Sequence, residues 1–213
     1  MVLLIQRVQQ MTLNDQGVNL MTQISVVNLL KEVSERKHLV TRPLGMEIRE
    51  KIIKYIISNE SKVVTIDFDE VGIIDYSGAD EVIVRLINRV VNKELGERFI
   101  ILKNLEPIHR DNIKAAFQIN KKFAVLELQN DHLSLIGNIK PMLTDILIKI
   151  YNEQIMTARN LADLTNSEIN LAGTKLLQLY QERLIMRKED TLLEGGRQFT
   201  YYPILDKNII LGR

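Results

Sequence analysis

"VVTIDFDEVGIIDYSGADEVIVRLI", residues 63–87, contains the three pieces from which the predicted fold is built. It begins as an apolar, β-branched run typical of a buried strand, and it ends with apolar residues at helical spacing. Between these two runs lie the turn residues Asp75, Tyr76, Ser77 and Gly78. A strand, a polar turn and an amphipathic helix form the repeating unit of α/β proteins, so this stretch predicts that fold class.

The same alternation continues on both sides of the stretch. Apolar residues at helical spacing predict helices over residues 25–36, 43–58 and roughly 106–118, and "HLVT" at 38–41 predicts a short strand. The apolar runs "GERFIILKN" and "KKFAVLEL" predict two further strands. Strands that are apolar throughout and separated by helices imply a small, mostly parallel or mixed sheet with flanking helices.

The pattern changes after residue 128. "QNDHLSLIGNIKP" is polar and contains Gly137 and Pro141, and three closely spaced helical segments follow it, the second capped by Thr157 and the third by Ser167. Two short strands joined by the glycine-containing tip "LEGGR" come next. Three helices followed by such a hairpin are the order of a winged helix-turn-helix domain.

These patterns divide the chain into four parts. They are an N-terminal segment of uncertain order at 1–22, an α/β domain at 23–130, a linker at 131–140 and a winged-helix domain at 141–213.

Composition excludes several function classes. The 213 residues include 28 basic and 27 acidic side chains, a net charge of +1, so the chain lacks the overall charge of a general polyanion binder. It contains no cysteine, which excludes disulfides and thiolate metal sites. No apolar stretch approaches the ~20 residues that span a bilayer, and "MVLLIQR" lacks the features of a signal peptide. We therefore expect a cytoplasmic protein without a membrane partner.

Motifs for catalysis are missing from the sequence. It contains no glycine-rich phosphate loop and no nucleophile elbow, and Ser77 has no histidine nearby in sequence to activate it. The acidic residues between Asp67 and Glu81 lack the alternating spacing and the glycine of a calcium loop. The sequence predicts no enzyme, no metal site and no cofactor.

Ser77 has two interpretations. With Asp80 three residues later, it matches a capping box, a structural role that contributes ~1 kcal/mol. A phosphoryl group on the same hydroxyl would lie at a helix N-terminus, which favours negative charge. Ile66 to Val84 contains no lysine or arginine, so such a group needs cations from elsewhere.

The stretch 63–87 resembles the STAS family of anti-sigma-factor antagonists, and more closely its STAS-like branch, which has motifs similar to "TRPLG" at 41–45 and "DYSGADE" at 75–81. The resemblance covers about residues 24–128. It implies a small mixed sheet flanked by helices and a serine, here Ser77, that a partner kinase phosphorylates. We predict a partner-binding loop formed by Asp75, Tyr76, Gly78, Asp80 and Glu81, with cations from Arg42 and Lys103, which follow predicted strands.

Residues 140–205 resemble winged-helix transcription regulators, on "LADLTN", "AGTKLLQLYQERLI" and "EGGRQFTYYPI". The resemblance implies a recognition helix that faces a major groove and a wing that reaches phosphates. The predicted DNA-binding residues are Arg159, Ser167, Asn170, Thr174, Lys175, Gln178, Lys188 and Arg197, with Gly173 on the same helix.

The sequence thus favours a transcription-related regulator that works by partner switching. Its partner would be a serine kinase or an anti-sigma-like protein, and occupation of the loop around Ser77 would free or sequester the winged helix. The alternative is a protein–protein adaptor in which the winged helix binds no DNA. Homo-oligomers are compatible with either hypothesis.

Overall fold

The computed structural model describes residues 12–14, 17–19, 21–34, 37–120, 123–191, 195–205 and 210–211. Within the predicted N-terminal segment, strands β1 (Thr12–Asn14) and β2 (Gly17–Asn19) pair as an antiparallel hairpin. Residues 1–11, 15–16 and 20 of that segment lie outside the described residues.

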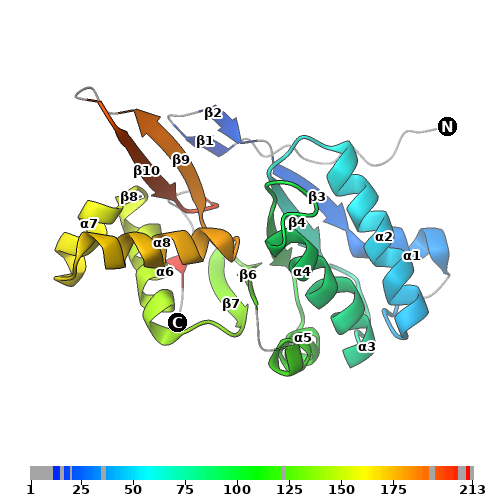
Figure 1. Ribbon diagram of the computed structural model, residues 1–213. Coiled ribbons are helices and arrows are strands. Elements are labelled where there is room, and N and C mark those ends of the chain that lie inside the picture. The colour runs from blue at the N-terminus through cyan, green and yellow to red at the C-terminus, as the bar shows by residue number, and fades with distance from the viewer. Residues whose placement is uncertain are drawn as a thin grey trace.

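A six-stranded mixed sheet forms the centre of the molecule, in the order β11-β7-β6-β5-β4-β3 (Figure 1). Strands β3, β4, β5 and β6 run parallel, β7 is antiparallel to β6, and β11 is parallel to β7. Their bounds are β3 (Met21–Ser25), β4 (Val63–Asp67), β5 (Phe99–Lys103), β6 (Ala124–Gln129), β7 (His132–Gly137) and β11 (Ile210–Leu211). Flanking helices complete an α/β fold, which confirms the predicted class.

One face of the sheet is covered by the helices that connect its parallel strands. They are α1 (Val26–Val33), α2 (Arg42–Ser58), α3 (Tyr76–Ala79), the π-helix η1 (Asp80–Val84), α4 (Arg85–Val91) and α5 (Pro107–Asn120). Their apolar sides form one core with the alternate sheet residues Ile24, Val64, Ile66, Ile100 and Leu102. The helices α3, η1 and α4 follow one another without a break, so residues 76–91 form a single helical run.

The C-terminal residues cover the other face. They form α6 (Pro141–Glu153), β8 (Met156–Thr157), α7 (Ala158–Thr165), α8 (Ile169–Gln181), β9 (Met186–Thr191) and β10 (Arg197–Tyr202). The three short strands pair antiparallel in the order β8-β10-β9. The predicted cap of α7 is confirmed, because Thr157 and Asn160 form a reciprocal capping box.

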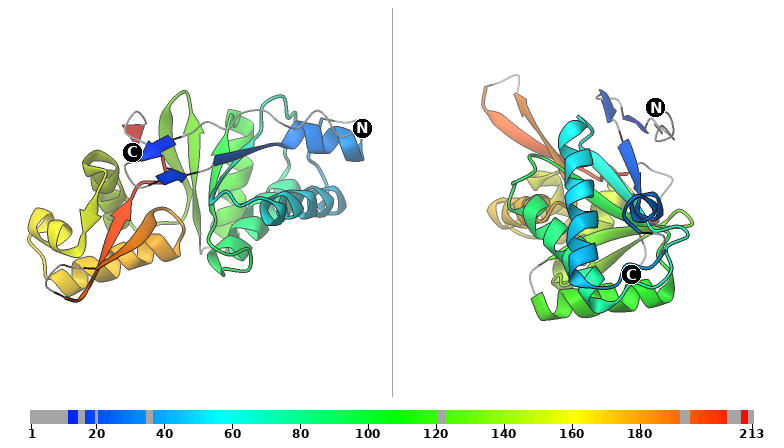
Figure 2. Two further views of the ribbon diagram at one scale, coloured as in Figure 1. Left: turned by 90° about the horizontal axis from the view of Figure 1, so that it is seen from above. Right: turned by 90° about the vertical axis from the view of Figure 1, so that its right-hand side faces the viewer.

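The two parts of the chain share the sheet as a common layer. Val63, Phe99, Ile101, Leu126 and Leu133 point away from the first core and pack with α6, α8 and β9 in a second one. Figure 2 shows the sheet between the two groups of elements. The C-terminal residues are therefore packed onto the α/β part along a buried apolar surface.

Three sequence predictions need correction. Residues 132–137, predicted as linker, form β7, because Asn130 and Asp131 adopt left-handed backbone conformations that close a tight hairpin with β6. Strand β3 was missing from the prediction, since Met21–Ser25 is a short, polar edge strand without an apolar run. The predicted strand at 38–41 is a single bridge between Leu39 and Ile74.

Within the described ranges, none of the helices combines the length and the apolar character that crossing a membrane requires.

The shared sheet predicts that both parts of the chain unfold together. Ile101 is fully buried in the second core, so Ile101→Ala should lower the free energy of unfolding by ~2–5 kcal/mol. Urea denaturation followed by circular dichroism should show one cooperative transition, shifted to lower urea. Ile57→Ala, at a side chain that is 65% exposed, is the control and should change stability by at most ~0.5 kcal/mol. Two transitions, only one of them shifted, would contradict a common core.

Candidate functional site

The N-terminus of α3 is capped by Asp75, and the prediction that Ser77 is the cap was wrong. The Asp75 carboxylate accepts a hydrogen bond from the Gly78 backbone N–H at 2.7 Å, and its backbone is extended as a cap requires. Ser77 is the second helical residue and is half-buried. Its hydroxyl forms no hydrogen bond with the described residues, so Ser77 does not contribute to capping α3.

Gly78 has a packing role in the structure, and its role in partner binding stays a prediction. A Cβ atom at Gly78 would lie 2.2 Å from the carbonyl oxygen of Leu39, and one at Gly45 would lie 2.9 Å from Cβ of Glu81. Gly45 allows α2 to approach the 76–91 helical run closely, and Gly78 allows that run to approach the backbone of Leu39, which precedes α2. Tyr76 is half-buried and packs against the first core.

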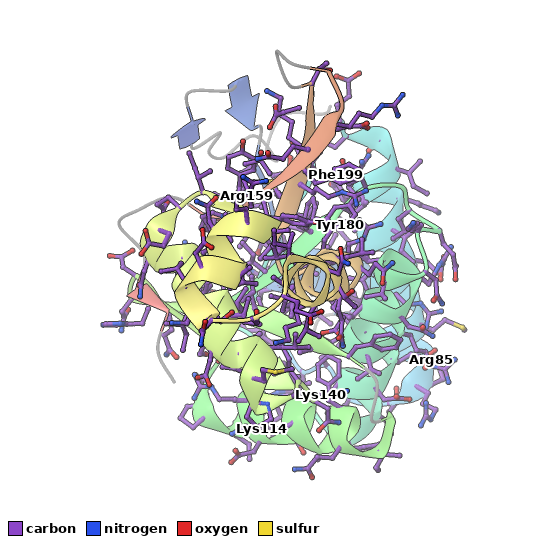
Figure 3. The ribbon with its side chains drawn as sticks, turned by 60° about the vertical axis from the view of Figure 1, so that its left-hand side comes forward. Arg85, Lys114, Lys140, Arg159, Tyr180 and Phe199 are labelled. Atoms are coloured by element: carbon purple, nitrogen blue, oxygen red, sulfur yellow. The ribbon has the colours of Figure 1, made fainter. Side chains whose placement is uncertain are left out.

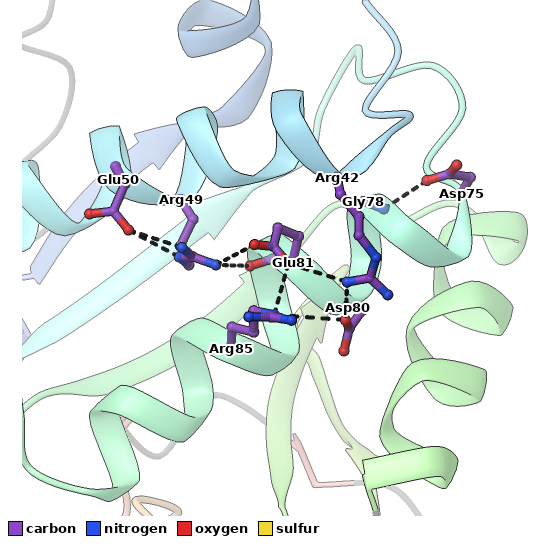
Figure 4. Close-up of polar contacts among 8 residues, drawn as sticks. All are labelled: Arg42, Arg49, Glu50, Asp75, Gly78, Asp80, Glu81 and Arg85. Atoms are coloured by element: carbon purple, nitrogen blue, oxygen red, sulfur yellow. Dashed lines mark hydrogen bonds and ion pairs between the residues drawn. The ribbon is translucent and has the colours of Figure 1, made fainter.

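Asp80 and Glu81 are buried, at 8% and 5% exposure, and cannot form the predicted partner-facing acidic edge. Arg42 contacts Asp80 at 2.8 Å and Glu81 at 3.4 Å. Arg49 reaches Glu81 at 2.9 Å, and Arg85 lies 2.7 Å from the same carboxylate (Figure 4). Buried carboxylates need such partners, because an unpaired charge in the interior is costly.

The network leaves two guanidinium groups exposed next to the buried acids. Three arginines meet the carboxylates of Asp80, Glu81 and Glu50, and the side chains of Arg42 and Arg85 remain 50% and 54% exposed. Sequence reasoning had identified Arg42 and had missed Arg49 and Arg85. Their positions carried a signal: Arg49 lies two helical turns after Arg42, and Arg85 lies four residues after Glu81.

Lys103 is the last residue of β5. Among the described residues, no ion pair joins it to Asp80 or Glu81. Its neighbour Asn104 donates to the Asp67 carboxylate at 2.8 Å, and Gln23 donates to the other oxygen at 2.6 Å. Asp67 thus ties together the carboxyl ends of three parallel strands.

The predicted DNA-binding residues are spread over α7, α8, the turn between them and the β9-β10 hairpin. Asn170 and Thr174 on α8 and Arg159 on α7 are exposed, and Lys175 is half-buried. Several others have intramolecular partners: Gln178 donates to Glu182, Lys188 pairs with Asp190, and Arg197 pairs with Glu189. Ser167 does not cap α8 as predicted, since its hydroxyl lies 2.8 Å from the Thr165 hydroxyl and Glu168 precedes the helix.

A ladder of alternating aromatic rings and guanidinium groups links the C-terminal part to the central sheet. Its members, in order, are Phe199, Arg187, Tyr180, Arg183 and Phe99. The guanidinium carbon of Arg187 lies 4.1 Å from the Phe199 ring centre and 4.3 Å from that of Tyr180. That of Arg183 lies 5.5 Å from Tyr180 and 5.8 Å from Phe99. We call these five residues the cation–π ladder.

Hydrogen bonds fix Tyr180 and Arg183, the two ladder residues next to Phe99. The Tyr180 hydroxyl donates to Glu97 at 2.7 Å, and Lys62 pairs with the same carboxylate at 2.5 Å. Burial raises the pKa of Glu97, but the hydrogen bonds from Lys62 and Tyr180 outweigh it and leave the pKa below its usual value. Arg183 is 5% exposed and donates from Nε to the Val90 carbonyl at the end of α4. The ladder therefore joins α8 to both α4 and β5.

Within the described ranges, no group of three histidine or acidic side chains is placed to hold a metal ion. Comparison with protein-family models finds none that matches the chain, and comparison with curated proteins finds no relative.

The cap assignment predicts unequal effects of two neighbouring substitutions. Asp75→Ala removes the acceptor of the Gly78 N–H and should cost ~0.5–2 kcal/mol of unfolding free energy. Ser77→Ala, the matched control in the same turn, should cost at most ~0.5 kcal/mol. Urea denaturation of both variants measures the difference. A larger loss for Ser77→Ala would show that the serine carries the capping role.

Proposed function

We propose that this chain is a non-enzymatic, transcription-related regulator in which a STAS-like, partner-binding α/β part is combined with a winged helix that binds DNA. The observation that carries the proposal is the arrangement of residues 141–202. Three helices, followed by the β9-β10 hairpin that pairs with β8, support a winged helix, in which α8 would be the recognition helix.

Charge and exposure in this part of the chain support contact with a polyanion. Asn170 and Thr174 on α8 are exposed polar side chains of the kind that contact base edges. Arg159 and Arg197 are exposed on neighbouring elements, and the salt bridge from Arg197 to Glu189 joins two exposed side chains. Exposed pairs of this type contribute little, so a phosphate can replace Glu189.

The surface around Ser77 supports the partner-binding half of the proposal. Asp80 and Glu81 follow Ser77 by three and four residues, so all three share one side of the helical run. Arg42 and Arg85 cover that side with exposed guanidinium groups. A phosphoryl group on Ser77 would therefore have the guanidinium groups of Arg42 and Arg85 on its own side of the helical run, as ion partners shared with Asp80 and Glu81.

The shared core changes the expected mechanism. Release of the winged helix would expose Val63, Phe99, Ile101, Leu126 and Leu133, and each such side chain contributes ~1.5–3 kcal/mol when buried. The summed contribution of the five side chains is comparable with the ~5–15 kcal/mol that stabilise a whole domain. Regulation in the proposal therefore works by covering or uncovering α8 and the hairpin while the two parts stay packed together.

DNA binding predicts a characteristic salt response. Fluorescence anisotropy with a 30-base-pair random duplex, at about 50 to 200 mM salt, should show affinity that falls steeply with salt. Lys175→Gln and Arg197→Gln should each weaken binding and lower the slope of log K against log salt by ~1. Lys114→Gln on α5 removes the same charge elsewhere and should change neither quantity.

No binding at the lowest salt, or binding that salt does not change, would reject DNA binding and favour the adaptor. A specific observation supports this second candidate. The side chains of Ile169 and Phe199 line one groove beside the polar positions of α8 and are 49% and 38% exposed. Exposed apolar side chains in one region are typical of protein-binding surfaces.

Phosphorylation of Ser77 predicts a mass difference. The protein isolated from its own host should contain a species about 80 daltons heavier, by intact-mass spectrometry, and Ser77→Ala expressed in the same host should lack it. Tyr76→Phe, with the neighbouring hydroxyl removed, is the control and should retain the heavier species. Its absence from the wild-type protein, or its persistence in Ser77→Ala, would contradict the assignment.

A further inference from the structure

A groove of about 370 Å³ lies between the start of α7, the exposed side of α8 and strand β10. Its apolar wall includes Ile169 and Leu177 from α8, and Phe199 and Tyr201 from β10. Ile169 is 49% exposed and Phe199 is 38% exposed, so both present apolar surface to whatever enters. The groove is large enough for one bulky side chain and the backbone around it.

Positive charge surrounds this apolar wall. Arg159, Arg187 and Arg197 line the groove, and no acidic side chain is among its described lining residues. Glu189 lies outside it and pairs with Arg197 at 3.2 Å, across two exposed side chains. A carboxylate in the groove would therefore meet the guanidinium groups of Arg159 and Arg187, with no acidic side chain of the lining competing for them. It could also replace Glu189 as the ion partner of Arg197.

Arg187 is held in position before any ligand arrives. Its guanidinium group lies between the rings of Phe199 and Tyr180, at 4.1 and 4.3 Å, as part of the cation–π ladder. Figure 3 shows Arg159, Tyr180 and Phe199 around the same end of the molecule, while Lys114 lies apart from them on α5. A guanidinium group fixed in this way loses little conformational entropy when it binds an anion.

We propose that this groove binds an acidic peptide segment that carries one bulky apolar side chain. The apolar side chain would lie against Ile169 and Phe199, and the flanking carboxylates would reach Arg159, Arg187 and Arg197. Charge complementarity selects the acidic flanks, and the exposed apolar wall selects a peptide over a nucleic-acid backbone. A phosphodiester chain would leave that wall uncovered.

The inference goes beyond the proposed function, because the groove lies beside the face of α8 that would contact DNA. An acidic segment in the groove would neutralise arginines that DNA also needs, so the two ligands would compete. Peptide binding itself does not depend on DNA binding. Failure of one therefore remains distinguishable from failure of the other.

Selection from a peptide library tests the proposal. A random twelve-residue library displayed on phage, selected against the full chain, should enrich sequences with Asp or Glu on both sides of a Leu, Ile, Phe or Trp. The enriched peptide, synthesised with a fluorescent label, should bind in an anisotropy titration. Arg159→Gln and Phe199→Ala should each weaken its affinity by about tenfold, the range of interface residues that dominate binding.

Controls separate the groove from general charge attraction. Lys114→Gln should leave peptide affinity unchanged, and a peptide whose apolar residue is replaced by serine should bind about tenfold more weakly. Circular dichroism spectra of Arg159→Gln and Phe199→Ala, compared with the wild-type spectrum, verify that both variants fold. Enrichment without acidic and apolar character, or equal affinity for wild type and Arg159→Gln, would overturn the proposal. DNA binding that requires Arg159, without any peptide binding, would assign the groove to DNA and reject the peptide.

Discussion

Burial of the central strands on both faces is the constraint on which the rest of the structure depends. Strands β4, β5 and β6 alternate their side chains between two cores, so that Val64 packs with the helices of the α/β part and Val63 with the C-terminal part. A parallel strand that is apolar on both sides is stable only when both sides are covered. The C-terminal residues therefore complete the α/β fold, in addition to any binding role of their own. This arrangement favours regulation by access to exposed surfaces over regulation by separation of the two parts.

Burial also determines how the charged residues between the helices are paired. Asp80 and Glu81 lie where α2 and the helical run 76–91 meet, and burial at that contact requires counter-charges from both helices. Arg49 is nearly as buried as Glu81, with 11% of its side chain exposed, whereas Arg42 and Arg85 extend to the surface. Asp80 and Glu81 are buried in ion pairs between the two helices, and the guanidinium groups of Arg42 and Arg85 stay exposed. A stretch that is acidic in sequence thus has its charges balanced by arginines, two of which extend to the surface.

The fold was predictable where periodicity was strong. Strands β4, β5 and β6 and the long helices follow from apolar runs and helical spacing. Strands β3 and β7 are partly polar, and only the turn at Asn130 and Asp131 carried a local signal for β7. Ser77 and Asp75 both suit a helix cap, and the choice depends on backbone conformation that sequence does not specify. The cation–π ladder was beyond prediction, because it joins Phe99 to Phe199 through contacts between residues from separate elements.

The ladder also limits what binding in the groove can change elsewhere. A chain of contacts transmits a change only when its members have two arrangements available. Arg183, at the inner end, is 5% exposed and bonded to the Val90 carbonyl, so it has little freedom to move. Arg187, at the outer end, is half-buried and faces the groove. A ligand that contacts Arg187 would therefore act on the hairpin and α8, and Arg183 would stay bonded to the Val90 carbonyl. The proposed competition between peptide and DNA would accordingly stay local to the groove. A partner that links the groove to the surface around Ser77 would have to be large enough to contact both places.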